Sequence, residues 1–253
     1  MNGEETIDQK KMNEVIQVKH LAKRFRNFTA NDNLTFDVYR GEIFGFLGAN
    51  GAGKTTAIKI LCGLSEPTEG EVNVNGFDIY KQREMIKRNI GYMSQKFSLY
   101  EDLTIEENID FFGGIYALKR KHLKEKKEEL LETLNIIHQR NKKIAELPLG
   151  WKQKLAFSIA IIHQPGIVFL DEPTGGVDPI TRRQFWDMIY GAVDKGITVF
   201  VTTHYMDEAE YCDRVSIMVE GRIEVLDRPE NMKKTYGAES MNDVFIKLAR
   251  KKQ

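Results

Sequence analysis

A glycine-rich stretch at 48–56, reading Gly-Ala-Asn-Gly-Ala-Gly-Lys-Thr-Thr, constrains the fold of this chain more than any other feature. An apolar run at 43–47 precedes it and suits a buried strand, while residues 57–61 suit a helix. A strand, a loop of this composition and a helix, in that order, form a phosphate-binding loop. The glycines let backbone N–H groups surround phosphate oxygens, and the N-terminus of the helix adds partial positive charge.

Different residues of this loop have different predicted roles. We expect the Lys54 ammonium to reach the β and γ phosphates of a nucleotide, and the Thr55 hydroxyl to bind Mg²⁺. A chance glycine-rich turn is the alternative, but the flanking strand and helix patterns argue against it. The predicted nucleotide-binding residues of the loop are Gly48, Asn50, Gly51, Ala52, Gly53, Lys54, Thr55 and Thr56.

Two adjacent acids, Asp171 and Glu172, end an apolar run at 167–170. Charges at the end of a buried strand must be paired or metal-bound, because an unpaired charge in an apolar setting is costly. In a chain with a phosphate loop, Asp171 is placed to hold Mg²⁺ through water, and Glu172 to polarise the water that attacks the γ-phosphate. A plain strand end is the alternative, and the upstream loop makes nucleotide hydrolysis the favoured interpretation.

Three short apolar runs, at 43–47, 167–170 and 197–201, are typical of strands covered on both faces of a parallel sheet. Alternating apolar and polar residues at 15–20 and 34–39 predict half-buried antiparallel strands near the start of the chain. Helix-like stretches lie between these segments, so the order of elements predicts an α/β fold.

The middle of the chain, from about 100 to 163, has few β-branched alternations and predicts a helical insertion. A charged run at 119–129 carries both signs, which favours a solvated helix face over a basic patch for nucleic acid. The apolar face of the same helix is formed by Leu123, Leu130, Leu131 and Leu134.

Composition limits the partners and the location that we expect. Lys plus Arg and Asp plus Glu each total 37, so the formal net charge is zero and no nucleic-acid partner is expected. Cys62 and Cys212 lack the spacing of a disulfide framework or zinc site, which indicates reduced thiols in the cytoplasm. The polar, acidic residues 1–10 are unlike a signal peptide, and the apolar runs are shorter than the roughly 20 residues of a spanning helix.

Two later motifs make the sequence resemble the ATP-binding cassette ATPases along nearly the whole chain. They are Asp-Glu-Pro-Thr-Gly-Gly-Val-Asp-Pro at 171–179 and Thr-Thr-His at 202–204. The resemblance implies an α/β P-loop NTPase cassette with a mostly parallel core sheet, an N-terminal antiparallel β subdomain and a helical insertion. It implies a single domain over 1–253, with a core at about 13–99 and 164–232, a helical subdomain at about 100–163 and a C-terminal helix at 233–253.

The resemblance also assigns roles to residues whose patterns are weak in isolation. Gln95 matches the glutamine that senses Mg²⁺ and the attacking water, and His204 matches the switch histidine that contacts the γ-phosphate. Asp178 matches the aspartate of the loop that crosses between subunits. Phe25, 29 residues before the loop lysine, stands where the family places an aromatic that stacks on adenine, with Phe28 as its rival. The implied catalytic residues are Glu172, His204 and Gln95, and the implied Mg²⁺ residues are Thr55, Gln95 and Asp171.

The signature motif departs from the family pattern. Where the family usually has Leu-Ser-Gly-Gly-Gln, residues 147–151 read Leu-Pro-Leu-Gly-Trp. We expect Gly150 to precede a helix that begins near Trp151 and to face the γ-phosphate held by the opposite subunit. Pro148 offers neither a hydroxyl nor an N–H, so a phosphate hydrogen bond is lost and a weak ATP-driven dimer is expected. The variant resembles cassettes that serve exporters of drugs, lipids or polysaccharides.

The resemblance implies a subunit that binds and hydrolyses ATP with Mg²⁺ in a transporter of the exporter type. A second cassette subunit would pair with it head to tail, as a homodimer, and both would act on an integral membrane permease from its cytoplasmic face. The permease contact is expected at 97–102, just after Gln95. One alternative is a soluble family ATPase acting on a ribosome or DNA-associated complex, which usually carries two cassettes or long coiled coils. A regulator without turnover is a third class, and it would lack Glu172 or His204.

Overall fold

The computed structural model describes residues 14–96 and 99–250. Three sequence-based predictions therefore fall partly or wholly outside the described residues. They are the interpretation of residues 1–10 as unlike an export signal, the first two residues of the expected permease contact, Phe97 and Ser98, and the last three residues of the expected C-terminal helix.

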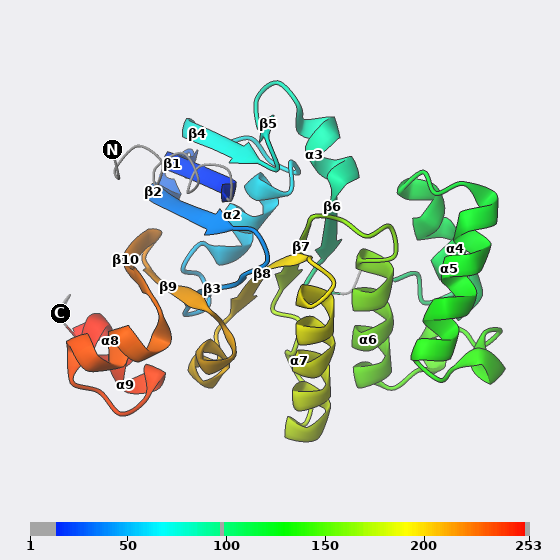
Figure 1. Cartoon of the computed structure of the whole chain (residues 1–253). Coiled ribbons are helices and arrows are strands. Elements are labelled where there is room, and N and C mark those ends of the chain that lie inside the picture. Colours follow the sequence, from blue (N-terminus) through cyan, green and yellow to red (C-terminus); the bar gives the residue numbers. More distant parts are fainter. Residues whose placement is uncertain (1–13, 97–98, 251–253) are drawn as a thin grey trace, which may run out of the picture.

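Strands and helices alternate through most of the chain, as the α/β pattern predicts (Figure 1). The strands are β1 (Glu14–Phe25), β2 (Phe28–Tyr39), β3 (Ile43–Gly48), β4 (Glu69–Val74), β5 (Phe77–Asp78), β6 (Ile90–Met93), β7 (Ile167–Asp171), β8 (Thr198–Thr203), β9 (Arg214–Val219) and β10 (Arg222–Asp227). The helices are α2 (Lys54–Leu61), α3 (Arg83–Asn89), α4 (Ile105–Ile115), α5 (Arg120–Thr133), α6 (Leu149–Ala160), α7 (Pro179–Val193), α8 (Pro229–Tyr236) and α9 (Met241–Arg250), with short 3-10 turns that include η3 (Met206–Tyr211).

The larger sheet has the strand order β10-β9-β3-β8-β7-β6, in which the β9–β10 pair is antiparallel and the pairs among β9, β3, β8, β7 and β6 are parallel. Every residue of β3, β7 and β8 is buried, which is why these strands read as continuous apolar runs in the sequence. The third run is displaced, because its strand occupies 198–203 rather than 197–201. The mostly parallel core sheet is as predicted.

The smaller sheet has the order β2-β1-β4-β5 and is antiparallel. Its first two strands are longer than the alternating segments that predicted them, and they meet in a tight hairpin where Phe25 pairs with Phe28. Irregular register at several points of the pair interrupts the period-2 pattern, which explains why the alternation covers only part of each strand.

A cluster of phenylalanine rings fills the space between the two sheets. Phe200 on β8 is fully buried at its centre, with its ring centroid 5.4 to 6.2 Å from four other rings. One of these rings comes from the antiparallel sheet and three from the parallel sheet, so the cluster ties the two sheets into one core. The four are Phe36, Phe44, Phe46 and Phe169.

The helices α4, α5 and α6 enclose a hydrophobic cluster of their own, beside the β6 side of the large sheet (Figure 1). The predicted apolar face of α5 points into this cluster. The charged run on α5 is mostly exposed, as expected, but Lys127 is an exception. It is buried, and its Nζ lies 2.7 Å from Glu106 and 2.9 Å from Asp110, so it joins α5 to α4.

The C-terminal part differs from the single helix expected at 233–253. Gly237 adopts a φ of 56°, a left-handed conformation that suits glycine, and it ends α8. A second helix, α9, then packs back against α8 and η3. The glycine inside the segment was the sequence signal for this break.

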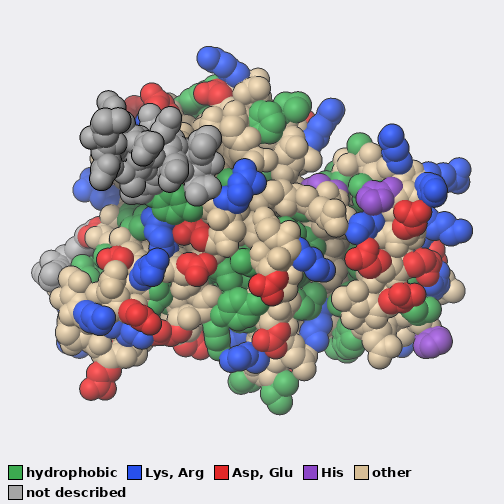
Figure 2. Space-filling view, viewed as in Figure 1, with side chains coloured by type: hydrophobic (Ala, Val, Ile, Leu, Met, Phe, Trp, Pro, Cys, Tyr) green, Lys and Arg blue, Asp and Glu red, His purple; other side chains and the backbone are tan. Residues whose placement is uncertain are grey.

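Surface charge is mixed, in line with the zero net charge. Acidic and basic side chains are interspersed on the face of the molecule shown in Figure 2. Within residues 14–96 and 99–250, no helix has the length and apolar character needed to cross a membrane.

Removing the central ring of the aromatic cluster should destabilise the whole domain. We expect Phe200→Ala to lower the free energy of unfolding by about 3–5 kcal/mol, because it leaves a cavity where both sheets meet. Urea denaturation followed by circular dichroism measures this. Met85→Ala, at a side chain that is 42% exposed, is the control and should cost well under half as much. Equal losses in the two variants would contradict the shared core.

Candidate functional site

The parallel register of the large sheet brings the predicted site residues to one edge. β3, β7 and β8 are neighbours, with Leu47 paired to Thr203 and Asp171 paired to Thr202. Their carboxyl ends therefore meet, and each strand leads into one predicted motif. The glycine-rich loop follows β3, Glu172 follows β7, and His204 follows β8.

The glycine-rich loop has the geometry of an anion cradle. Gly51 and Gly53 adopt φ values of 83° and 103°, and a Cβ on Gly53 would lie 2.2 Å from the carbonyl oxygen of Ala30. The helix α2 begins at Lys54, with neither a side-chain cap nor an acidic residue in its first turn. Its first N–H groups have no intrahelical acceptor, so the site fits the phosphates of a nucleotide.

The side chain of Lys54 is buried inside this loop. Its Nζ donates to the carbonyl oxygens of Gly48 at 2.8 Å and Ala49 at 3.1 Å, and it lies 3.3 Å from Glu172 Oε1. These contacts hold the ammonium group at the mouth of the loop, where a phosphate would meet it.

Glu172 is the point where the predicted catalytic residues converge. Gln95 Nε2, from the segment after β6, donates to Glu172 Oε2 at 3.1 Å, and His204 Nδ1 lies 3.1 Å from the same oxygen. Glu172 has a left-handed φ of 49°, and its backbone N–H bonds back to Thr202 on β8. This turn directs the carboxylate away from the strand and toward the loop.

Asp171 remains in the strand and faces α2. Its Oδ1 accepts hydrogen bonds from Thr202 Oγ1 at 2.7 Å and from Thr55 Oγ1 at 3.3 Å. Burial raises the pKa of Asp171, and these two bonds oppose the shift. Among the described residues, no cluster of three or more His, Cys, Asp or Glu side chains could hold a metal ion, so Mg²⁺ would fit here through hydroxyl, carboxylate, phosphate and water oxygens rather than in an acidic cage.

Sequence reasoning assigned no role to Thr202, although it lies within a quoted motif. Its hydroxyl orients Asp171 and also accepts the Glu172 N–H. The available signal was a pair of threonines at the end of the apolar run 199–201, directly before a histidine. The β7–β8 pairing that joins them is visible only in the tertiary structure.

A cavity of about 390 Å³ opens over these residues. From the antiparallel sheet, Phe28 and Ala30 line it, whereas Phe25 does not. Phe25 instead packs under Lys23, with the ammonium 5.1 Å from the ring centroid. The structure thus favours the rival aromatic, because the hairpin directs Phe28 toward the loop. The other lining residues are Asn50, Gly51, Gly53, Lys54, Thr55, Thr56, Gln95 and Glu172.

Gly150 and Asp178 lie apart from this cavity. The helix α6 begins at Leu149 with Pro148 as its N-cap, so Gly150 lies inside the first turn rather than before the helix, and the expected start near Trp151 is wrong. Asp178 caps α7, accepting from the N–H groups of Ile180 and Thr181.

Close packing of α6 against α7 explains why residue 150 is a glycine. A Cβ on Gly150 would lie 2.5 Å from Thr181 Cγ2. The Thr181 hydroxyl is in turn held by Asp178 Oδ2 at 2.6 Å. The signature segment and the Asp178 loop are therefore fixed to each other within one subunit.

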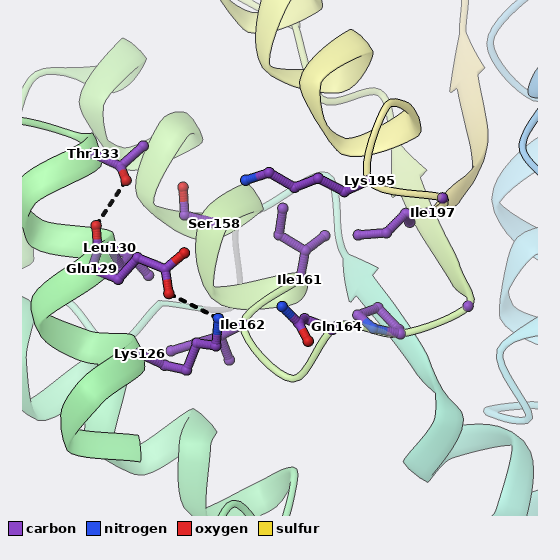
Figure 3. Close-up of a pocket in the computed structure, with 13 residues that line it drawn as sticks. Lys126, Glu129, Leu130, Thr133, Ser158, Ile161, Ile162, Gln164, Lys195 and Ile197 are labelled. Carbon is purple, nitrogen blue, oxygen red and sulfur yellow. Dashed lines mark hydrogen bonds and ion pairs between the residues drawn. The ribbon is translucent and has the colours of Figure 1, made fainter. Parts of the chain in front are cut away.

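A second cavity, of about 340 Å³, lies at the opposite edge of the sheet (Figure 3). It is found where β7 and β8 begin, and it is lined by α5, the end of α6 and the loop at 195–197. It contains none of the predicted site residues. The carboxyl edge alone brings together the glycine loop, the acids, Gln95 and His204.

Comparison with known proteins agrees with this geometry. A family model described as "ABC transporter" matches residues 31–175. The chain is 48% identical over 229 residues to "Probable multidrug ABC transporter ATP-binding protein YbhF" of Escherichia coli (strain K12), a match that covers 90% of this chain but only 39% of that protein. It is 34% identical over 210 residues to "Linearmycin resistance ATP-binding protein LnrL" of Bacillus subtilis (strain 168), covering 83% of this chain and 68% of that protein.

A solved structure shares the fold with a TM-score of 0.77 and 25% identity, covering 84% of this chain and 98% of the other. It is the ATP-binding cassette MJ0796, dimeric and bound to ADP and Pi in a post-hydrolysis state. The chain therefore belongs to the ABC transporter family, as an ATPase domain of that family. The predicted family and fold class are confirmed.

The two rival aromatics can be separated by nucleotide affinity. We expect Phe28→Ala to weaken ATP binding about five-fold or more, because stacking on a base is worth roughly 1–3 kcal/mol. Phe25→Ala, a matched change at the paired hairpin position, should leave the affinity within about two-fold. Titration calorimetry measures both. A larger loss for Phe25→Ala would restore the original assignment.

Proposed function

We propose that this chain is the ATP-hydrolysing subunit of an exporter, and that it couples closure of a cassette dimer to movement of a permease. The observation that carries the proposal is the Glu172 carboxylate, which lies within 3.3 Å of Lys54 and 3.1 Å of both Gln95 and His204. A single carboxylate thus connects the phosphate loop, the segment after β6 and the histidine after β8.

Each residue of this constellation has a task that suits its chemistry. Lys54 and the loop N–H groups bind the phosphates. Glu172 takes a proton from, or polarises, the attacking water, and Gln95 and His204 orient the carboxylate and the terminal phosphate. Thr55, Asp171 and Gln95 would hold Mg²⁺, which when bound neutralises charge on the phosphate oxygens.

Pairing of two cassettes would complete the site. In this chain Gly150 and Asp178 do not line the cavity that holds Lys54, so they are free to serve the nucleotide of a second subunit. The solved relative is itself a dimer. We therefore propose a head-to-tail homodimer, with the weak signature at Pro148 making closure depend on the permease.

The names of the relatives support export. One is named as a multidrug transporter subunit and another as a linearmycin resistance protein. This chain spans only 39% of the multidrug transporter subunit, and we propose that transport is carried out by the cassette dimer together with its permease. We propose that the permease contact lies at residues 97–102, just after Gln95, and that the chain acts on the cytoplasmic face of the membrane. A ribosomal or DNA-associated role has no comparable support.

Glu172→Gln tests the proposed chemistry. It should lower ATP turnover by about 100-fold or more while ATP still binds, because the amide keeps the shape but cannot act as a base. Lys54→Ala should instead weaken ATP binding itself, since it removes the cation that meets the phosphates. Phosphate release and titration calorimetry measure the two effects. Parent-level turnover in Glu172→Gln would refute the role of this carboxylate.

A test of the signature motif at 147–151 needs a variant in which a side chain at position 150 does not clash with α7. Gly150→Asp alone would push against Thr181 Cγ2, so it should be made together with Thr181→Ser, which removes that methyl group and keeps the hydroxyl bond to Asp178. We expect the double variant to bind ATP as a monomer but neither dimerise nor hydrolyse it, because a carboxylate would face the γ-phosphate. Thr181→Ser alone is the control. Normal hydrolysis by the double variant would place the signature outside the active site.

A further inference from the structure

Beside the Glu172 site lies a buried polar cluster that the chemistry described so far does not use. Thr174 and Glu208 are both almost fully buried, and the Thr174 hydroxyl donates to Glu208 Oε1 at 2.5 Å. Arg182 of α7 lies on the other side, with its Nε 3.6 Å from the same oxygen. A side-chain hydrogen bond and an ion pair therefore meet on one carboxylate oxygen.

This cluster joins two segments that reach the active site separately. Thr174 comes two residues after Glu172, in the loop that follows β7. Glu208 comes four residues after His204, in η3, and its N–H bonds to the carbonyl oxygen of Tyr205. The Thr174–Glu208 bond thus fixes the loop of the carboxylate against the segment of the histidine.

Arg182 reinforces the histidine side of this junction. Its guanidinium lies 4.2 Å from the ring centroid of Tyr205, the residue next to His204, and its Nη1 donates to Asp207 at 3.3 Å. The Tyr205 ring in turn lies 4.2 Å from the His204 ring. Contacts therefore run without interruption from Arg182 to the histidine.

The helix that carries the signature reaches the same loop. Gln153 of α6 is fully buried, and its Nε2 donates to the carbonyl oxygen of Gly175, the residue after Thr174. One short loop is therefore held from both sides, by a glutamine of the signature helix and by the carboxylate of η3.

Stability alone is a poor reason for such a cluster. Removing a carboxylate and a guanidinium from water carries a desolvation penalty that their attraction rarely exceeds, and apolar residues of similar volume often serve as well or better. An ion pair and a directional hydrogen bond on one buried carboxylate do fix the relative position of the segments that carry them. Here those segments carry Glu172 and His204, and the distance from His204 Nδ1 to Glu172 Oε2 is 3.1 Å.

We propose that Glu208 is a positioning residue for ATP hydrolysis. It acts through Thr174 to hold the Glu172 loop and the His204 segment in a fixed relative position. Its side chain is fully buried and does not line the cavity over the phosphate loop. Its loss would let the two segments shift independently, so the carboxylate and the histidine would no longer face the terminal phosphate together. The inference rests on the proposed hydrolytic function of Glu172.

The test compares steady-state hydrolysis and ATP binding in full-length variants. Thr174→Val removes the hydroxyl at nearly constant volume, and Glu208→Gln removes the charge and keeps the shape. Each should lower kcat about ten-fold or more, the size expected for losing a bond to a charged group, with KM and Kd for ATP within about three-fold. Combining the two changes should cost little more than either alone, because both break one link.

Two controls separate positioning from a general loss of stability. Thr174→Ser keeps the hydroxyl and should retain kcat within about two-fold of the parent. Glu210→Gln changes a neighbouring carboxylate of η3 that pairs with Lys233 of α8 rather than with the catalytic loop, and kcat should again be unchanged. Thermal unfolding of every variant shows whether a loss of kcat merely follows a loss of folded protein.

Three results would overturn the proposal. They are parent-level kcat in Thr174→Val and Glu208→Gln, a Thr174→Ser variant as slow as Thr174→Val, and a fall in kcat accompanied by an equal fall in ATP affinity. Glu172→Gln, measured in parallel, separates the two hypotheses. If that variant is inactive while Thr174→Val is normal, only the positioning role fails, whereas an active Glu172→Gln removes the proposed function as well.

Discussion

The parallel pairing of β3, β7 and β8 is the constraint on which the rest of the molecule depends. Because side-by-side parallel strands end at one edge, the pairing of Asp171 with Thr202 and of Leu47 with Thr203 sets how far apart the phosphate loop, the acids and His204 stand. A shift of one residue in β7 would turn Asp171 away from Thr55. The apolar residues that bury these strands therefore also set the geometry of the polar site.

Parts of this site could be predicted from the sequence because their chemistry is local. The glycine loop needs positive φ at Gly51 and Gly53, and the two acids need the end of a buried strand, so each motif carries its own structural context. The α/β order and the apolar face of α5 could be predicted from periodicity for the same reason. In each case neighbouring residues in the sequence are also neighbours in the structure.

Other parts could not be predicted, because they depend on contacts between distant segments. Choosing Phe28 over Phe25 requires the direction of the hairpin relative to the loop. The role of Thr202 requires the β7–β8 pairing, and the need for glycine at 150 requires the position of Thr181 on α7. The expected helix start near Trp151 is wrong because Gly150 was interpreted as lying before the helix, whereas α6 begins directly after its N-cap Pro148 and includes Gly150 in its first turn.

The contact between Gly53 and Ala30 has a consequence for what the cavity can accept. Ala30 lies two residues from Phe28 on β2, so a single strand touches the phosphate loop at one point and presents the aromatic ring at the other, about 7 Å away along the strand. This spacing belongs to the antiparallel sheet and does not involve the helices α4, α5 and α6. A base stacked on Phe28 would therefore stand at a distance from the phosphate loop that is set by this one strand.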